Sequence, residues 1–319
     1  MMQPSQIQKL ADKPLFQDPI WNGAADPTII WNHAHGTWWM IYTNRRANVE
    51  GLPGVSWVHA THLGCTESTD NGRTWKYRGI LEIPIGTPDD AHWAPEIIHA
   101  DGHYHMFLSL VPGVHNDWSG TREIHQLISD DLIHWIHVQQ IPLASNRVID
   151  ACVHRLPDGS WRLWYNNEAD QKSIYTADSP DLVHWTDTGK AVGDIPGEGP
   201  YVWHWRGAYY MVVDIWKGCA IYRSLDASRW TRQEDAILTE PGHGPDDVVM
   251  GGHPMVVCSG DRAFLFYFTH PGRTPQNAGL DNTETRRSSV QVVELIEKNG
   301  IISCDRDMPC LIDLKGPPL

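Results

Sequence analysis

Short apolar segments recur along this chain in pairs, with a glycine turn between the two members of each pair. In the first pair, residues 26–31 read Asp-Pro-Thr-Ile-Ile-Trp, Gly36 follows, and residues 38–42 read Trp-Trp-Met-Ile-Tyr. Such segments are typical of β-strands, and glycine turns join neighbouring antiparallel strands because Gly accepts positive φ. The pattern appears five times. The predicted first strands are 26–31, 94–99, 150–156, 198–203 and 253–258, and the predicted second strands are 38–42, 104–108, 161–165, 209–213 and 263–267.

A second signature follows each of the first four pairs: a Ser/Asp turn that ends in Trp. The polar side chains of such a turn satisfy its amides, and the Trp packs between sheets. We therefore interpret these Trp residues as structural. The fifth pair lacks the turn, and its outer strands are predicted at 289–295 and in a closing segment. The four turns span 68–75, 129–135, 179–185 and 224–230, and they end at Trp75, Trp135, Trp185 and Trp230.

The spacing of these units predicts the architecture. They begin about 48 to 68 residues apart, which is within the range of four-stranded propeller blades. Long helical periodicity and low-complexity linkers are absent from the sequence. We predict an all-β fold: one domain over residues 1–319, a five-bladed β-propeller with about four antiparallel strands in each blade. The predicted blades cover about 20–85, 92–143, 147–192, 197–240 and 250–312.

Charge and hydropathy narrow the range of partners. The 25 Lys and Arg against 39 Asp and Glu give a net charge of −14, which argues against nucleic acid or an anionic membrane as a partner. No run of 18 apolar residues occurs, so no membrane-spanning segment is expected. The first residues lack a basic region followed by an apolar one, which predicts a cytoplasmic protein, or a secreted or periplasmic one if a leader has been removed. The six scattered Cys fit a reduced compartment.

Tryptophan is unusually common: the chain has 16 Trp but only 5 Phe. Carbohydrate sites use Trp because its flat apolar face covers the C–H face of a sugar while its N–H still bonds. Most of these Trp residues repeat in the structural pattern, so packing is the favoured interpretation for any single one. The composition is therefore compatible with a sugar site without locating it.

Titratable residues gather at the start of the predicted first strands. When the strands are aligned on their apolar pairs, Asp26, Ala94, Asp150, Glu198 and His253 fall three positions before each pair. They could be turn residues that begin the blades, but burying several carboxylates close together is costly unless they are solvated or paired. Two carboxylates on either side of a sugar are the usual groups for glycosidic cleavage, and a third can raise the pKa of the acid. Carboxylates on blades four and one would leave room for a water molecule, which suggests inversion.

These motifs together resemble glycoside hydrolase family 43 and its five-bladed relatives, over roughly residues 20 to 270. The matching motifs are Asp26-Pro27, Trp93-Ala94-Pro95-Glu96, Ile149-Asp150, Glu198-Gly199-Pro200 and Gly252-His253. The resemblance implies that Asp26 is the general base, Asp150 the pKa modulator and Glu198 the general acid. Two departures are Ala25, where the family often has His, and Ala151-Cys152 in blade three. The chain also resembles the related family 117, which implies a His as an alternative acid.

Further candidates come from the ends of the second strands, which return to the face where the first strands begin. Polar loops at such a face are natural substrate binders, although solvated loop polarity is an equal alternative. Two Arg residues there could also bind a carboxylated sugar, such as a uronic acid. The predicted substrate-binding residues, including two from the blade-two motif, are Arg46, Trp93, Glu96, Asn167, Glu168, Trp216, His270 and Arg273.

The predicted function is that of an exo-acting, inverting glycosidase that releases a terminal sugar from a plant or algal oligosaccharide. No cofactor is expected to be required, but the resemblance leaves room for a structural or axial Ca²⁺, with His253 holding it through water. A homo-oligomer stays open. The alternative from a different class is a propeller that binds glycan without cleaving it.

Overall fold

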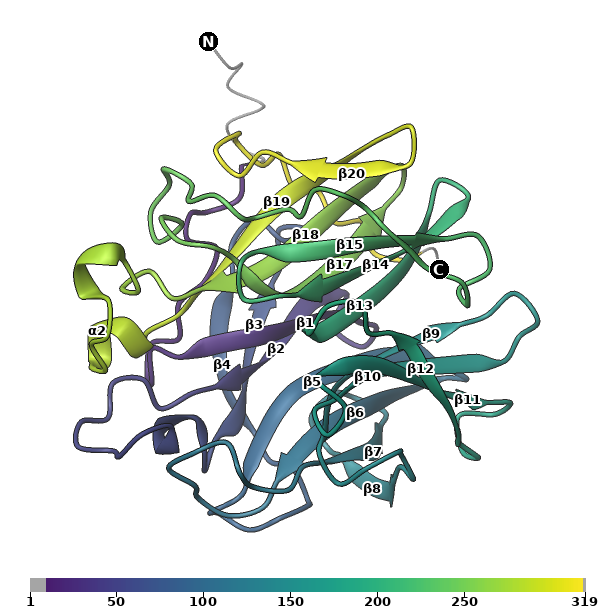
Figure 1. Ribbon diagram of the computed structural model, residues 1–319, viewed down its shortest axis with the longest axis horizontal. Helices are drawn as coiled ribbons and strands as arrows, with labels where there is room; N and C mark the ends of the chain where they lie inside the picture. The colour runs from purple at the N-terminus through teal and green to yellow at the C-terminus, as the bar shows by residue number, and fades with distance from the viewer. Residues whose placement is uncertain (1–9, 318–319) are drawn as a thin grey trace.

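The chain forms a ring of β-sheets (Figure 1). The computed structural model describes residues 10–317, and within that range twenty strands form five four-stranded antiparallel sheets. Blade one contains β1 (Ala24–Asn32), β2 (Thr37–Asn44), β3 (His62–Ser68) and β4 (Lys76–Leu81). Blade two contains β5 (Ala91–Ala100), β6 (His103–Val111), β7 (Glu123–Ser129) and β8 (Ile136–Gln140).

Blade three contains β9 (Val148–Arg155), β10 (Trp161–Asn167), β11 (Ser173–Ser179) and β12 (Thr186–Val192). Blade four contains β13 (Glu198–Trp205), β14 (Ala208–Asp214), β15 (Cys219–Ser224) and β16 (Thr231–Arg232). Blade five contains β17 (Gly252–Ser259), β18 (Arg262–Thr269), β19 (Ser289–Lys298) and β20 (Ile301–Cys304). Each first strand packs against the first strands of its two neighbours, so the ring is closed. The predicted all-β, five-bladed propeller is confirmed.

The Ser/Asp turns have the structural role that their sequence predicts. In blade two, Asp131 Oδ1 accepts the backbone N–H groups of Ile133 and His134, each at 2.8 Å. Trp135, at the end of this turn, is buried among the apolar side chains between blades one and two. Its indole N–H donates back to the Leu132 carbonyl, 3.2 Å away. The turn thus fixes the Trp, and the Trp fills the space between two twisted sheets.

Segments near both ends of the described chain pack between blades one and five, which are neighbours in the ring. On the N-terminal side, Phe16 exchanges backbone hydrogen bonds with Val290 of β19. On the C-terminal side, the Trp38 indole donates to the Leu314 carbonyl at 3.0 Å. Phe16 and Leu314 belong to one buried apolar cluster with strands of both blades. The terminal segments therefore supply the apolar contacts that join the last blade to the first.

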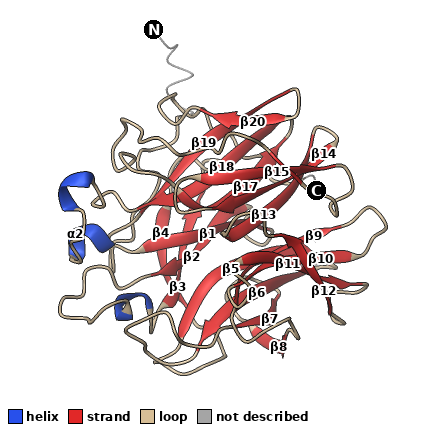
Figure 2. Ribbon diagram, viewed as in Figure 1, coloured by secondary structure: helices blue, strands red, loops and turns tan. Residues whose placement is uncertain are grey.

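Helical structure is confined to short turns in the connecting loops, and these turns lie together at one side of the molecule (Figure 2). They are η1 (Ser56–Val58), η2 (Pro275–Asn277) and α2 (Thr283–Arg286). Within residues 10–317, no helix has the length and apolar character that crossing a membrane requires. The loop between β18 and β19, which carries η2 and α2, forms part of the wall of the site described next.

Candidate active site

Every innermost strand has a bulge at the same place near its start. In β1 the pairing with β2 shifts between Ala25 and Thr28, and the other four first strands shift at the matching point. One residue of each bulge adopts positive φ: Asp26 (50°), Ala94 (44°), Asp150 (61°), Gly199 (56°) and His253 (42°). For a residue other than Gly this conformation costs about 1 kcal/mol or more, and such strain tends to persist where function requires it.

The bulges correct one prediction. Glu198 is not at the position of Asp26 and Asp150, because Gly199 is the blade-four residue with positive φ. Glu198 pairs with Asp214, as Ala25 pairs with Thr43, so it stands one residue earlier than predicted. The alignment slipped because Tyr201 was counted in the apolar pair. Proline follows the bulge residue in blades one, two, four and five, and aligning these prolines would have given the right register.

The bulge amides bind side chains from the preceding blade. The Ala94 N–H donates to Thr43 Oγ1 at 2.8 Å, and the Asp150 N–H donates to Ser109 Oγ at 3.0 Å. The Gly199 N–H donates to Asp150 Oδ2 at 2.9 Å, and the His253 N–H donates to Asp214 Oδ2 at 2.8 Å. These hydrogen bonds join each blade to the next at the level of the carboxylates, and they hold the bulge residues in fixed positions.

A cavity of about 650 Å³ opens at this level of the ring. Blades one, three and four supply its carboxylates, blade five supplies His253, and loops carrying Trp57, Trp118 and Arg273 supply much of its rim. Nine predicted residues line it: Asp26, Trp93, Asp150, Glu168, Glu198, Trp216, His253, His270 and Arg273. The structure thus brings together the three predicted catalytic carboxylates and most of the predicted substrate-binding residues.

Asp26 is buried and is held as an anion. Arg45 Nη2 lies 3.0 Å from each of its carboxylate oxygens, and His253 Nδ1 lies 3.4 Å from Oδ1. Burial by itself would raise the pKa of Asp26, but Arg45, His253 and a hydrogen bond from Thr43 outweigh burial and lower it. A carboxylate with a low pKa stays ionised over a wide pH range, as a general base must.

His270 keeps Arg45 in place. Its Nδ1 lies 2.9 Å from the Arg287 carbonyl, which can only accept, so the proton resides on Nδ1. Nε2 then accepts from Arg45 Nη1, 3.4 Å away. Burial, together with the nearby Arg273 and Arg45, lowers the pKa of His270 well below its ordinary value, so the ring is neutral. His270 lines the cavity, but its free nitrogen faces a guanidinium.

Asp150 has the opposite electrostatic setting from Asp26. Burial, together with the charges of Glu198 and Asp26, raises its pKa to about 7 against the opposing charge of His253. No Lys or Arg forms an ion pair with it among the described residues. A carboxyl group with this pKa can carry a proton near neutral pH.

Glu198 stands on the far side of the cavity from Arg45, and donors contact both of its oxygens. Lys172 Nζ lies 3.1 Å from Oε2, and the Trp216 indole N–H donates to Oε1 at 3.0 Å. Lys172 also lies 2.9 Å from Glu168 Oε1 and 5.0 Å above the centre of the Trp216 ring. It comes from the turn between β10 and β11, where Gln171 and Lys172 both have positive φ. Glu198 is about one quarter exposed, so it is the more accessible of the two proposed catalytic groups.

Asp214 is a fourth cavity carboxylate. It ends β14 and accepts the backbone N–H groups of Trp216, at 2.7 Å, and His253, at 2.8 Å. Burial raises its pKa to about 7, and the charge of Glu198 adds to this effect. Burial lowers the pKa of His253, but the charges of Asp26, Asp150, Glu198 and Asp214 outweigh burial and raise it. Asp214 therefore positions Trp216 and His253 on both sides of the cavity.

Comparison with solved structures finds the same architecture in known enzymes. A thermostable family-43 glycoside hydrolase aligns with a TM-score of 0.66 at 17% identity, over 95% of this chain and 98% of its own. A family-43 β-1,3-galactosidase with galactodeoxynojirimycin gives 0.63 at 13%, over 90% and 96%. An enzyme of this family from Xanthomonas citri, complexed with xylotriose, gives 0.65 at 14%, over 94% and 95%. The chain has the fold of glycoside hydrolase family 43. No protein-family model matches the sequence, and no curated protein matches it.

Three of the predicted binding residues lie outside the cavity of this family-43-like propeller. Arg46 Nη2 donates to the Ser56 carbonyl at 2.7 Å, so it anchors a loop. Asn167 is buried and accepts from Ser145 Oγ at 2.8 Å. Glu96 is buried against the Val153 N–H at 3.3 Å, and burial raises its pKa to about 8. Arg46 points away from the cavity because consecutive residues of an extended chain point to opposite faces, and Arg45 is the one that faces Asp26.

Cavity residues that were missed as site residues in the sequence include Arg45, Asp214, Lys172, Trp57 and Trp118. Arg45 and Asp214 lie at ends of second strands, where binding residues are expected, so pleat alternation could have identified Arg45. Lys172 and Trp57 lie in loops, and their sequence surroundings carry no comparable signal.

Metal binding does not emerge from the described side chains. Within residues 10–317, no group of three or more His, Cys, Asp or Glu side chains is arranged to hold a metal ion. His253 faces Asp26 with Nδ1 and has a raised pKa, which suits hydrogen bonding better than direct coordination. An axial Ca²⁺ held by His253 through water stays a prediction.

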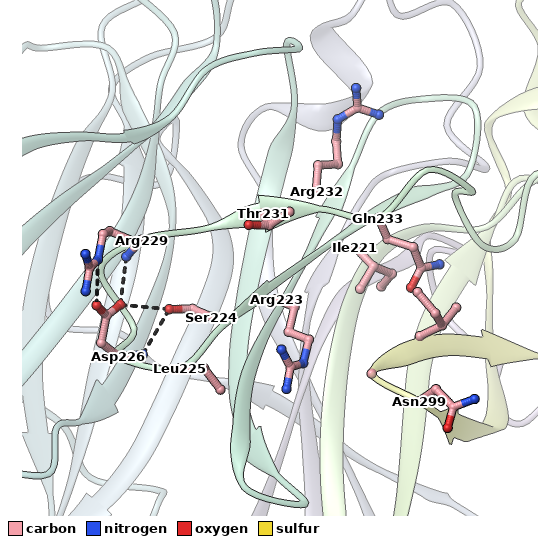
Figure 3. A pocket seen from close by; sticks show the side chains of 12 residues that line it. Ile221, Arg223, Ser224, Leu225, Asp226, Arg229, Thr231, Arg232, Gln233 and Asn299 are labelled. Carbon is pink, nitrogen blue, oxygen red and sulfur yellow. Dashed lines mark hydrogen bonds and ion pairs between the residues drawn. The ribbon is translucent and has the colours of Figure 1, made fainter.

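A second hollow, of about 490 Å³, lies at the outer edge of blade four, against the β19–β20 turn (Figure 3). Its lining has no residue in common with the carboxylate cavity. Asp226 there bonds Ser224 and Arg229, as in the other Ser/Asp turns of the propeller (Figure 3). We assign these groups to the fold.

Proposed function

We propose that this protein is a glycosidase that acts by inversion on the terminal sugar of an oligosaccharide. The observation that carries the proposal is the placement of two unlike carboxylates in one cavity: Asp26, fixed as an anion by Arg45, and Glu198, partly exposed, on a different blade. Blade five separates the blades that carry them, and no direct hydrogen bond links these two side chains among the described residues. This separation supports a water molecule between base and sugar.

In the proposed reaction, Asp26 removes a proton from water as the water oxygen attacks the anomeric carbon. Glu198 gives its proton to the glycosidic oxygen on the opposite face of the sugar, and the bond between this oxygen and the anomeric carbon breaks. The products are a free sugar of inverted configuration and the shortened alcohol. Asp26 ends protonated and Glu198 ends ionised, so one proton must return from Asp26 to Glu198 through solvent.

Asp150 supports the acid electrostatically. The Gly199 N–H donates to Asp150 Oδ2, so Asp150 lies directly beside the residue that follows Glu198. The two carboxylates repel each other, and the charge of Glu198 helps to raise the pKa of Asp150. This is the modulator role that the motif implies, and the raised pKa of Asp150, whose causes include the charge of Glu198, supports their coupling.

The surroundings of the carboxylates favour an oligosaccharide. Trp57, Trp93, Trp118 and Trp216 all line the cavity, and indole faces suit sugar rings. An adjoining hollow of about 710 Å³ shares Trp57 and Trp118 with the cavity. It provides room for further sugar units beyond the one that is cleaved. The xylotriose complex of the structurally similar Xanthomonas citri enzyme supports the same substrate class.

A panel of oligosaccharides and aryl glycosides tests the proposal. Release of a terminal monosaccharide is expected, and proton nuclear magnetic resonance of the first-formed anomer should show inverted configuration. Asp26→Asn and Glu198→Gln should each lower the rate while the proteins stay folded by circular dichroism. A retained anomer would refute inversion, and unchanged rates in both variants would refute the assignment of these carboxylates.

One observation favours the alternative of a glycan-binding propeller without catalysis. Both oxygens of Glu198 accept hydrogen bonds, one of them from the Lys172 ammonium, so neither oxygen is free to meet a glycosidic oxygen. The alternative predicts sugar binding with no cleavage of any panel member, and binding that survives in both variants. The glycosidase proposal requires substrate to displace Lys172 from Glu198.

A His acid in place of Glu198 has less support. The two His residues lining the described cavity are His253 and His270. His253 lies against the base Asp26, and the cavity-facing nitrogen of His270 is an acceptor. Neither is placed as a donor opposite Asp26.

A further inference from the structure

Arg273 is held in the cavity wall by two hydrogen bonds and by the close packing of the residue before it. It lies in the loop between β18 and β19, and its backbone N–H donates to the His270 carbonyl at 2.9 Å. Its side-chain Nε donates to the Thr285 carbonyl, also at 2.9 Å. The preceding Gly272 lies so close to Glu284 that a Cβ atom would stand 2.1 Å from the Glu284 carbonyl oxygen. Only glycine permits this approach, so the position of the Arg273 backbone is fixed.

The segment that supports Arg273 is itself well anchored. Asn282 caps α2 by accepting from the Thr285 N–H at 3.0 Å. Arg286 is buried, and it pairs with Asp281 at 2.6 Å and donates to the carbonyls of Val49 and Leu52. This wall therefore presents the Arg273 guanidinium from a preorganised loop, and preorganisation reduces the ordering cost of binding a ligand.

The charges in the cavity leave Arg273 without a partner. Asp26 pairs with Arg45, Glu198 pairs with Lys172, and Glu168 pairs with Arg122 and Lys172. The charge of Asp281, in the same loop, also acts on Arg273. Both oxygens of Asp281, however, are bound by Arg286.

No carboxylate of residues 10–317 forms an ion pair with Arg273. Burial in the recess lowers the pKa of Arg273 to about 10, and repulsion by Arg45 contributes. An uncompensated guanidinium beside a second one favours an incoming anion.

We infer that the sugar bound next to Asp26 carries an anionic oxygen group, a carboxylate or a sulfate, which binds the free edge of Arg273. This inference rests on the proposed function and specifies its substrate class. Because Nε is already engaged, the two terminal nitrogens of Arg273 are available for a paired contact with two oxygens of one group. Arg45 lies against Asp26 and also acts on Arg273, which places this end of the cavity beside the sugar that is attacked by the water activated by Asp26.

A neutral sugar would satisfy Arg273 less well. A hydroxyl group offers one oxygen without charge, whereas a carboxylate or sulfate offers two oxygens and a compensating charge. The cavity carboxylates do not oppose such a ligand strongly. Asp26, Glu168 and Glu198 are paired with cations, and the pKa values of Asp150 and Asp214, both about 7, let these groups be largely protonated in mildly acid solution.

Calorimetric titration at pH 6 tests the inference without requiring turnover. Galacturonate should bind at least about 10-fold more tightly than galactose, and glucuronate more tightly than glucose, as expected for charge-assisted bidentate contacts. Comparing galactose 6-sulfate with galacturonate distinguishes recognition of a sulfate from recognition of a carboxylate. Arg273→Met should weaken binding of the preferred anionic sugar by about 10- to 100-fold and change binding of the neutral sugar by less than about 2-fold.

The matched control is Arg206→Met, which removes an Arg whose partner is Glu297 and which lines neither the carboxylate cavity nor its adjoining hollow. It should leave both affinities unchanged, and thermal melting should show that Arg273→Met is folded. Arg273→Lys should recover part of the preference, because it restores charge without the paired geometry. Equal binding of acidic and neutral sugars, or a preference that survives in Arg273→Met, would overturn the inference.

Hydrolysis of aryl uronides and neutral aryl glycosides is scored separately. Cleavage without preference for the acidic sugar overturns the inference alone. Preferential binding of the acidic sugar without cleavage of either class supports recognition by Arg273 and counts against the proposed function.

Discussion

The two sides of the cavity hold their carboxylates in different ways. On one side, Asp26 is buried and bonded by the Arg45 guanidinium, which keeps its proton at any ordinary pH. On the other side, Glu198 is partly exposed, and it is bonded by Lys172, an ammonium at the end of a flexible stem on a loop. Under the proposed function, the kind of cation beside each carboxylate suits it to a different role. A permanent partner fixes Asp26 as an anion, and a displaceable partner leaves Glu198 accessible to substrate.

Removal of each carboxylate should show the largest difference between the two sides. Asp26→Asn is expected to lower kcat about 10²- to 10⁴-fold on every leaving group, since the attack of water always needs the base. Glu198→Gln should cost as much on alkyl glycosides but far less on dinitrophenyl glycosides, whose leaving groups need no proton. The measurement is kcat for both variants on matched substrates. An equal loss for Glu198→Gln on both leaving groups would remove its role as the acid.

Replacing the permanent cation should produce the next largest effect. Arg45 lowers the pKa of Asp26, so Arg45→Met leaves burial opposed only by His253 and Thr43 and raises this pKa. The acid limb of the kcat/KM profile should move to higher pH by about one to two units. Activity at pH 5 should fall about 10- to 100-fold, and recovery is expected at higher pH. Arg45→Lys is the matched control and should shift the limb less, while an unmoved limb would contradict this assignment of Asp26.

Replacing the displaceable cation should have a smaller effect. Lys172→Met removes the ammonium that contacts Glu198, Glu168 and the Trp216 ring. The kcat on alkyl glycosides should change by less than about 10-fold at pH 6, because Lys172 neither gives nor takes the transferred proton. Lys190→Met, which affects the exposed pair with Asp170, serves as the control. A loss as large as that of Glu198→Gln would show that Lys172 itself takes part in proton transfer.

Glu96 is a buried carboxyl group without a cation beside it. Its replacement should have the smallest effect on activity. Its pKa is about 8 when folded, above the ordinary 4.5, so folding favours its protonated form. Stability should thus fall as pH rises from about 5 to 8, by an amount on the order of a few kcal/mol. Glu96→Gln should remove this decline in thermal melting temperature and change kcat by less than about 2-fold.

The exposed Glu234→Gln should leave the decline in place. A decline that is identical in Glu96→Gln and the wild type would show that Glu96 is not its source.

The sequence predicts the ring well because each blade repeats the same local rules. Glycine turns, apolar strands and Ser/Asp turns that end in Trp are short-range features, so the blades and the structural role of Trp135 follow from them. The register of blade four does not follow, because a bulge adds a residue that apolar spacing cannot reveal. That is why Glu198 was aligned with Asp26 although Gly199 occupies the equivalent place.

The motifs predicted which carboxylates meet in the cavity, but they did not predict the cations that pair with them. Arg45 and Arg46 are adjacent, and only the pleat direction at the end of β2 decides which one faces Asp26. Lys172 reaches Glu198 from a turn on the preceding blade, a contact between residues 26 positions apart. Contacts of this kind depend on how blades pack against one another, which no local pattern encodes.

The seam between blades one and five affects the order in which the molecule should lose activity and structure on unfolding. The proposed base Asp26 belongs to β1 and its neighbour His253 belongs to β17, so their 3.4 Å contact crosses the same seam that Phe16 and Leu314 fill. A ring that parts at this joint would separate Asp26 from His253 while the remaining sheets keep their hydrogen bonds. During gradual heating or denaturation, loss of turnover should therefore precede loss of β-sheet signal. Opening of the seam that closes the ring should therefore be detected first as a loss of activity.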